Sequence, residues 1–156
     1  MQKKKDWVAK LNDNKDLPKI KNLEPEAAIR WDGESMIIPS PMDVNNIMKL
    51  VPEGKLITIN EIRHSLAKKF KTEICCPLTS GIFAWISAYA AEQEKGEGKA
   101  DYTPWRRTLK SGGQLNEKYP GGIDHQKILL ESEGHSITPE GKKYFVKDYE
   151  QKLFTS

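Results

Sequence analysis

The sequence predicts an α/β fold that is mainly α-helical and contains a helix-turn-helix unit with a small wing. The first observation is a capping box at Thr58 and Glu61, which begins a helix with a periodic apolar face. The second is an apolar segment at about 79–93 that follows a turn at Pro77 and predicts a second helix. The third is a glycine turn at 111–113 after a short strand, which predicts a hairpin-like wing.

Residues 1–35 are predicted to form an N-terminal arm, and residues 36–156 the main domain. The arm has a short helix with Trp7 and Leu11 on one face, and a second short helix after Pro25. It contains too few apolar residues to form a core of its own. We therefore expect the arm to pack against the main domain.

Caps and breakers predict the next elements. Residues 36–38 are extended, and Ser40 is a suitable N-cap for a helix whose first residue is Pro41. This helix ends before Pro52, and the helix that begins at Thr58 follows it. We therefore expect three helices in the first half of the main domain.

Glycine-containing turns divide the second half of the domain. A polar loop at 94–100 leads to a strand through Thr108 and Leu109. A helix follows from about 123 to Gly134, then a turn at 139–141 and a final amphipathic segment at 144–153. No internal repeat is present in the sequence.

Composition limits the class of protein. Of the 156 residues 37% are hydrophobic and 30% charged, and the net charge of +3 is compatible with nucleic-acid binding without requiring it. Cys75 and Cys76 are the two cysteines, and because they are adjacent they exclude a disulfide scaffold. No apolar run approaches the ~18 residues of a membrane helix. We expect a cytoplasmic protein without a membrane partner, a metal site or a cofactor-binding motif.

Three motifs resemble the DNA-binding domain of the alkylguanine-DNA alkyltransferases, also called methylated-DNA–protein-cysteine methyltransferases. Residues 51–58 read VPEGKLIT, similar to the family's lead into its helix-turn-helix. Residues 104–107 read PWRR, where the family has Pro-Cys-His-Arg. Residues 121–134 contain GGI, then LL, then EG, which closely resembles a third family motif. Their order and spacing agree, and the resemblance covers about residues 42–136.

The resemblance implies a protein that flips a damaged guanine out of double-stranded DNA. In that family a thiolate, activated by His and Glu, accepts the alkyl group. Here Trp105 occupies the cysteine position and Arg106 the histidine position, while Glu133 is retained. Neither indole nor guanidinium can replace that thiolate and base. We therefore predict no alkyl transfer at this position.

A branch of the family, the alkyltransferase-like proteins, also has Trp at the cysteine position. These proteins bind alkylated guanine without repairing it and hand it to other repair pathways. The chain is similar to this branch but departs from it at Arg106. By this resemblance, its expected partners are double-stranded DNA, including alkylated DNA, and repair proteins.

Two DNA-handling positions of the family have also changed. Ile59 stands where a Tyr rotates the backbone, and Leu78 where an Arg fills the gap left by the flipped base. Small residues at Ser80 and Gly81 would allow a close approach to DNA or tight helix packing. We predict that the pocket or DNA-binding set comprises Ile59, Leu78, Ser80, Gly81, Trp105, Arg106, Tyr119, Gly121, Gly122 and Glu133.

Several interpretations remain open at this stage. Trp105 either lines a lesion pocket or fills it as a core aromatic, and the remodelled site either binds DNA or recognises a small molecule or protein. Arg106 and Arg107 would point to opposite faces of a strand, which leaves one for phosphate and one for Glu133. Arg63 belongs to a basic set on its helix that suits phosphate contact or a solvated face. Catalysis by Cys75 or Cys76 is a further alternative, against buried and inert thiols.

Overall fold

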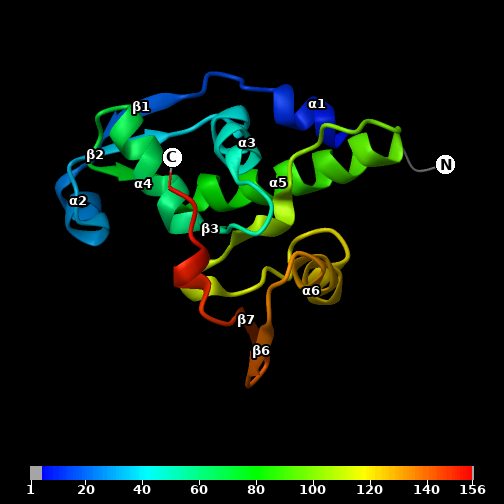
Figure 1. Cartoon of the computed structure of the whole chain (residues 1–156). Helices are drawn as coiled ribbons and strands as arrows, with labels where there is room; N and C mark the ends of the chain where they lie inside the picture. The colour runs from blue at the N-terminus through cyan, green and yellow to red at the C-terminus, as the bar shows by residue number, and fades with distance from the viewer. Residues whose placement is uncertain (1–4, 156) are drawn as a thin grey trace.

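The computed structural model describes residues 5–155 and has a mixed α/β fold (Figure 1). Its first elements are α1 (Trp7–Asn12), β1 (Lys19–Asn22) and α2 (Pro25–Trp31). Strand β1 runs antiparallel to β2 (Ser35–Ile38), and β2 pairs in parallel with β4 (Ile74–Cys75). The two short helices expected in the arm are present, and β1 adds the arm to a sheet that continues into residues 36–75.

Helix α3 (Pro41–Leu50) precedes the helix-turn-helix, which is built from α4 (Ile59–Lys69) and α5 (Pro77–Gly96). Both predicted N-termini carry their caps. The Asp43 carboxylate accepts from the Ser40 backbone N–H at 2.9 Å, and the Glu61 carboxylate accepts from the Thr58 N–H at 3.2 Å. Helix α5 is longer at both ends than the predicted 79–93.

The second half begins with a 3-10 turn, η1 (Trp105–Arg107), followed by β5 (Thr108–Leu109). Strand β5 pairs in parallel with β3 (Ile57–Thr58), and a second 3-10 turn, η2 (Ser111–Gly113), follows. The hairpin expected at 111–113 was therefore placed wrongly. The strand and the turn were correct: the Lys110 N–H donates to the Gln114 carbonyl at 2.8 Å across the turn. The strand partner was wrong, because β5 pairs with β3 about fifty residues earlier and, in the described part of the chain, no strand after the turn pairs with β5.

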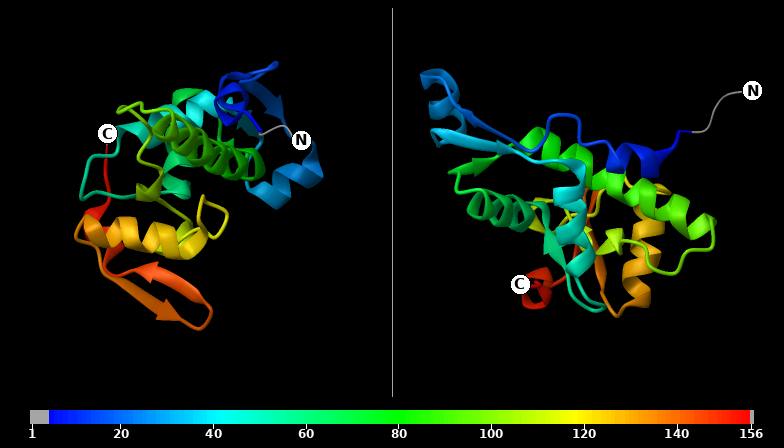
Figure 2. Two further views of the ribbon diagram at one scale, coloured as in Figure 1. Left: turned by 90° about the vertical axis from the view of Figure 1, so that its right-hand side faces the viewer. Right: turned by 90° about the horizontal axis from the view of Figure 1, so that it is seen from above.

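The remaining elements are α6 (Gly122–Ser132), the antiparallel strands β6 (Ile137–Glu140) and β7 (Lys143–Val146), and η3 (Tyr149–Lys152). The hairpin of the fold is this β6–β7 pair, built around the turn predicted at 139–141. Figures 1 and 2 show α6 and the hairpin below α5, away from the β1–β2–β4 sheet. Among residues 5–155, no helix is long and apolar enough to cross a membrane.

Two groups of buried side chains hold these elements together. The larger contains residues of α3, α4 and α5 together with Trp105 and Tyr119. The smaller joins Leu109 and Leu115 to Leu130 of α6 and Val146 of β7. Because β5 lies between the two groups, the segment after Trp105 links the helix-turn-helix to α6.

Candidate functional site

Trp105 lies inside the core. Its side chain is 1% exposed, and its ring meets Tyr119 edge-on with centroids 5.2 Å apart. The ring of His125 is tilted against the indole ring of Trp105, with the two ring centroids 5.6 Å apart. The indole Nε1–H donates to the Glu92 carboxylate of α5 at 3.1 Å, which satisfies its one polar group. Trp105 therefore fills its position as a core aromatic.

Glu133, the C-cap of α6, binds both arginines that follow Trp105. Its carboxylate is 3% exposed and accepts from Arg106 Nε and from Arg107 Nε, the latter at 2.8 Å. Arg107 also donates to the Val51 carbonyl at 2.8 Å. The expectation that one arginine would point away to phosphate was wrong, because residues 105–107 form a 3-10 turn and both side chains reach the same carboxylate.

The pKa of Glu133 reflects this pairing. Burial raises it, but the hydrogen bonds and positive charges of Arg107 and Arg106 outweigh burial, and the net direction is downward. Glu133 is therefore ionised near neutral pH, and two cations between α6 and η1 share its single negative charge. This arrangement joins α6 to η1 and occupies the Glu133 carboxylate.

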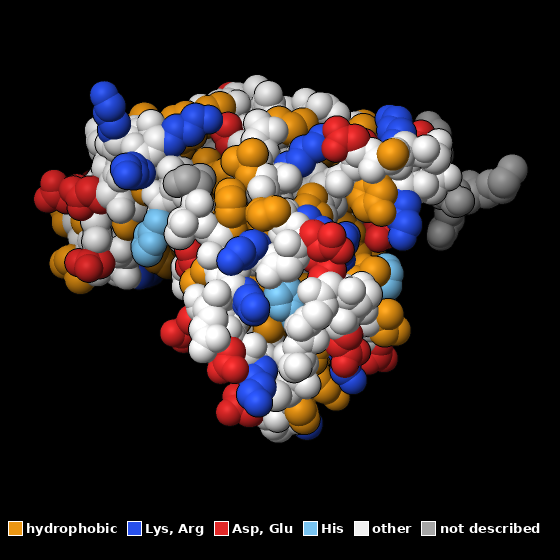
Figure 3. Space-filling model, viewed as in Figure 1, with side chains coloured by type: hydrophobic (Ala, Val, Ile, Leu, Met, Phe, Trp, Pro, Cys, Tyr) orange, Lys and Arg blue, Asp and Glu red, His pale blue; other side chains and the backbone are white. Residues whose placement is uncertain are grey.

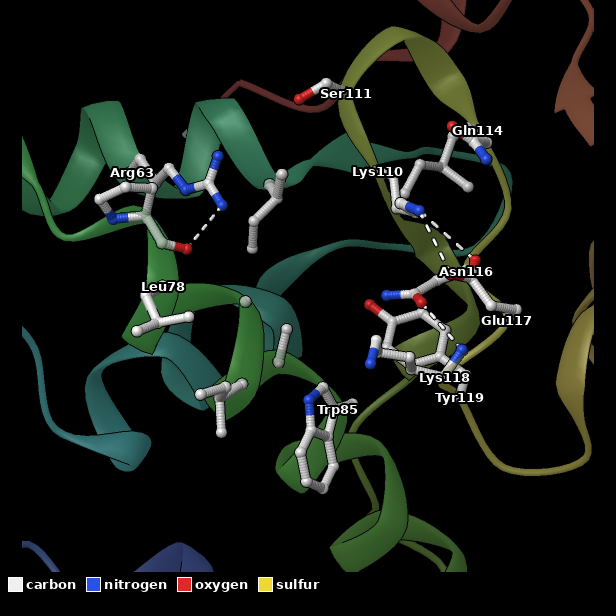
Figure 4. A pocket seen from close by; sticks show the side chains of 16 residues that line it. Arg63, Leu78, Trp85, Lys110, Ser111, Gln114, Asn116, Glu117, Lys118 and Tyr119 are labelled. Atoms are coloured by element: carbon white, nitrogen blue, oxygen red, sulfur yellow. Dashed lines mark hydrogen bonds and ion pairs between the residues drawn. The ribbon is translucent and has the colours of Figure 1, made fainter. Parts of the chain in front are cut away.

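A cavity of about 630 Å³ opens between the helix-turn-helix and the segment after β5 (Figure 4). One wall comes from α4 and the first half of α5, and the other from residues 109–119. Arg63 and Leu78 lie on one side and Lys110, Asn116 and Tyr119 opposite, and Trp85 of α5 lies at the lower end of the view. The cavity thus lies at the N-terminal end of the presumed recognition helix.

Four of the predicted site residues line this cavity, namely Ile59, Leu78, Gly81 and Tyr119. Leu78 is 70% exposed at its mouth, whereas Tyr119 is buried. Burial raises the pKa of Tyr119, so its phenol stays protonated. Trp105 lies behind Tyr119, so the ring that faces the cavity belongs to Tyr119.

The other predicted residues lie outside the cavity lining. Ser80 is fully buried and its hydroxyl donates to the Cys76 carbonyl at 2.8 Å. Gly121 has φ of +79°, and a Cβ there would lie 2.6 Å from the His125 Cβ, which explains the requirement for glycine. Gly122 also has positive φ, +70°, and begins α6. Arg106 and Glu133 pair with each other as described.

Sequence reasoning missed Arg63 and Trp85 as parts of one site. Ile59 and Arg63 are four residues apart on α4 and so share a face, which is the signal that was available. Trp85 is contacted by the arm: Trp7 meets it edge-on at 5.8 Å and stacks on Tyr89 at 4.7 Å. The arm therefore supports a residue of the cavity wall.

The cysteines are placed away from this chemistry. Cys75 is buried in β4, and burial raises the pKa of its thiol to about 12, so almost no thiolate forms near neutral pH. Neither cysteine lines the cavity. Within residues 5–155, no group of three His, Cys, Asp or Glu side chains is arranged to hold a metal ion.

A solved structure shows the same fold. The S. pombe Atl1 structure in complex with damaged DNA containing O6-carboxymethylguanine aligns with a TM-score of 0.51 at 20% identity, over 74% of this chain and 94% of that one. A second structure, S. pombe ATL with DNA, aligns over the same shares with a TM-score of 0.45 at 19% identity. No protein-family model and no curated protein sequence matches the chain. The likeness to Atl1 confirms the fold predicted from the three motifs, that of an alkyltransferase-like protein.

Proposed function

We propose that the protein binds double-stranded DNA and takes one flipped base, an alkylated guanine, into the cavity between α5 and residues 109–119. The observation that carries this proposal is the cavity itself, at the N-terminal end of α5, the helix expected from the sequence to be the recognition helix. The related fold of Atl1, whose structure holds DNA with an O6-carboxymethylguanine, agrees with it.

The size and lining of the cavity suit a base. Its volume of about 630 Å³ lies within the ~300–1,000 Å³ of pockets that bind small molecules. Trp85 offers an aromatic surface, and Gln114 and Asn116 offer amides for the edge of a base. Transfer of the alkyl group of such a base from water to an apolar wall is favourable.

The same site argues for binding without alkyl transfer. No thiol lines the cavity, and Trp105 behind Tyr119 has no nucleophilic atom. Glu133 is engaged by two guanidinium groups and so is not available as a base. We therefore propose a protein that recognises the lesion and leaves it chemically unchanged.

Gly81 allows a direct test. It lines the cavity on α5, and an added Cβ would be 3.9 Å from the nearest atom, Arg63 Nη2, so Gly81→Leu extends a side chain into the cavity from a Cβ that meets no close neighbour. Gly96→Leu is the matched control on the same helix, because nothing lies within 4 Å of its Cβ position and it is outside the cavity. Affinity is measured by fluorescence anisotropy on duplexes with O6-methylguanine or guanine.

We expect wild type and Gly96→Leu to prefer the O6-methylguanine duplex, and Gly81→Leu to lose at least tenfold of that preference. Equal affinity of the wild-type protein for the two duplexes would contradict the proposal. So would a preference that Gly81→Leu retains, because the lesion would then be read somewhere else.

A second candidate is a binding module of the same fold that recognises a small molecule or a protein. It is favoured by the absence of Lys and Arg from residues 78–93 of α5. On the face in Figure 3, positive and negative side chains are interspersed without a broad basic patch. This candidate predicts no duplex binding at low salt, together with a small-molecule stabilisation in thermal shift that Gly81→Leu abolishes.

A further inference from the structure

Arg63 is an unusual cation in this chain. Its half-buried guanidinium donates to three neutral oxygens: Nε to Ser80 Oγ at 2.9 Å, Nη2 to the Pro77 carbonyl at 2.9 Å, and Nη1 to Asn60 Oδ1 at 3.2 Å. It forms no ion pair with a carboxylate anywhere in residues 5–155. A partly desolvated charge without a counter-charge is costly, and a bound anion would remove that cost.

The surroundings of Arg63 favour an anion. Three cations line the cavity, of which Lys110 pairs with Glu117 and Lys118 is exposed, so Arg63 is the rigidly held one. It lies beside the first turn of α5, a 20-residue helix that no side chain caps. A guanidinium has five N–H groups, and the three bonds above leave two for a ligand.

We propose that Arg63 binds a backbone phosphate of the DNA strand whose base enters the cavity. This inference rests on the proposed function. The guanidinium is held on the cavity wall opposite Lys118 and Tyr119, so a base between the walls carries its own sugar-phosphate towards the mouth, where Leu78 is exposed. The fixed, forked donor geometry of Arg suits phosphate.

The slope of binding against salt concentration tests this contact. Each phosphate neutralised contributes about −0.9 to the slope of log K against log salt for duplex DNA. Arg63→Gln removes the charge. Asn60→Asp keeps every donor of Arg63 and replaces the amide oxygen that accepts from Nη1 with a carboxylate oxygen. The new carboxylate neutralises the charge of Arg63. An acidic side chain is also favourable in the first turn of α4. Both variants should reduce the slope by about 0.9.

Two charge-matched controls lie outside the cavity. Lys68→Gln removes an exposed cation from the same helix, and Asn46→Asp adds an acid to an exposed site on α3. Both should leave the slope unchanged. A slope unchanged in Arg63→Gln and Asn60→Asp would overturn the proposal, and a purely structural role of Arg63 would give that result with a lower melting temperature.

Measuring O6-methylguanine and undamaged duplexes separates this inference from the proposed function. If neither duplex is preferred but the slope falls in both Arg63-directed variants, lesion recognition fails and the phosphate contact stands. If the lesion is preferred and the slope is unchanged, only the phosphate contact fails. If neither duplex binds, both fail. Stabilisation by inorganic phosphate that Arg63→Gln abolishes, with an unchanged DNA slope, would assign the site to a free anion and overturn the DNA contact.

Discussion

Glu133→Gln should be the most informative single change to the stability of the protein. The Glu133 carboxylate is 3% exposed and lies between the guanidinium groups of Arg106 and Arg107, whose side chains are 19% and 12% exposed. Glutamine keeps the size of the side chain and one oxygen acceptor. It loses the charge, and its NH₂ group faces a donor.

The cost follows from the two cations that remain. Removing one partner of a buried ion pair costs about 3–5 kcal/mol. Because Arg106 and Arg107 retain some contact with water, we expect a loss of about 2–3 kcal/mol in the free energy of unfolding. For a chain of this length each kcal/mol lowers the melting temperature by roughly 2–4 °C, so the expected fall is roughly 4–12 °C.

Urea unfolding followed by tryptophan fluorescence measures this difference. The pKa of Glu133 is lowered in the folded state, so its contribution is complete above the unfolded pKa of about 4.3 and is lost as the pH falls through the lower folded value. The stability gap between wild type and Glu133→Gln should therefore be full at pH 7 and narrow towards pH 3.

The control is Glu117→Gln, which removes a half-exposed carboxylate that pairs with Lys110 at 3.4 Å. Exposed pairs contribute about 0–1 kcal/mol, so this variant should stay within that range of wild type. Equal stabilities of Glu133→Gln and Glu117→Gln at pH 7 would refute the view that Glu133 joins α6 to η1. A gap that does not change with pH would refute its ionic origin.

Three further changes test other parts of the structure. Gly121→Ala should lower the free energy of unfolding by about 1–3 kcal/mol, because its φ is +79° and the new Cβ meets His125, whereas Gly98→Ala, with φ of +84° and open space, should cost less in the same urea assay. In Cys76→Ser the remaining Cys75 thiol should react with Ellman's reagent at pH 8 only slowly until urea is added, and rapid labelling of the native protein would contradict its burial. Trp105→Phe should lose about 1–3 kcal/mol through the unpaired Glu92 and the smaller ring, and a melting temperature equal to wild type would show that the indole bond to Glu92 is dispensable.

Local signals in the sequence predicted most helix positions. The caps at Ser40 and Thr58 are contacts within four residues, so the sequence specifies them directly. The C-terminal end of α5 was placed too early because residues 94–96 are polar and include glycine. The structure continues the helix to Gly96, since Glu, Gln and Lys favour helix and Gln93 accepts from the Trp7 backbone N–H at 2.7 Å.

Contacts between distant segments were beyond the same reasoning. The partner of β5 is β3, and nothing in residues 108–113 indicates a parallel neighbour fifty positions away. Arg106 and Arg107 were expected to diverge because a strand was assumed to include them, whereas a 3-10 turn brings both to Glu133. From its position in the sequence, Arg63 was grouped with the exposed lysines of its helix. The cavity beside Arg63 could not be seen from the helix alone, because its opposite wall comes from residues 109–119.

Trp105 is buried behind the cavity wall and does not itself line the cavity. Trp105 is closed off by Tyr119 on one side and held by Glu92 on the other, so a ligand in the cavity meets Tyr119 first. The side chain at position 105 therefore supports the cavity wall from behind, while Arg63, Leu78 and Trp85 are among the residues that line the cavity. Under the proposed function, these groups select a ligand by shape, stacking and charge.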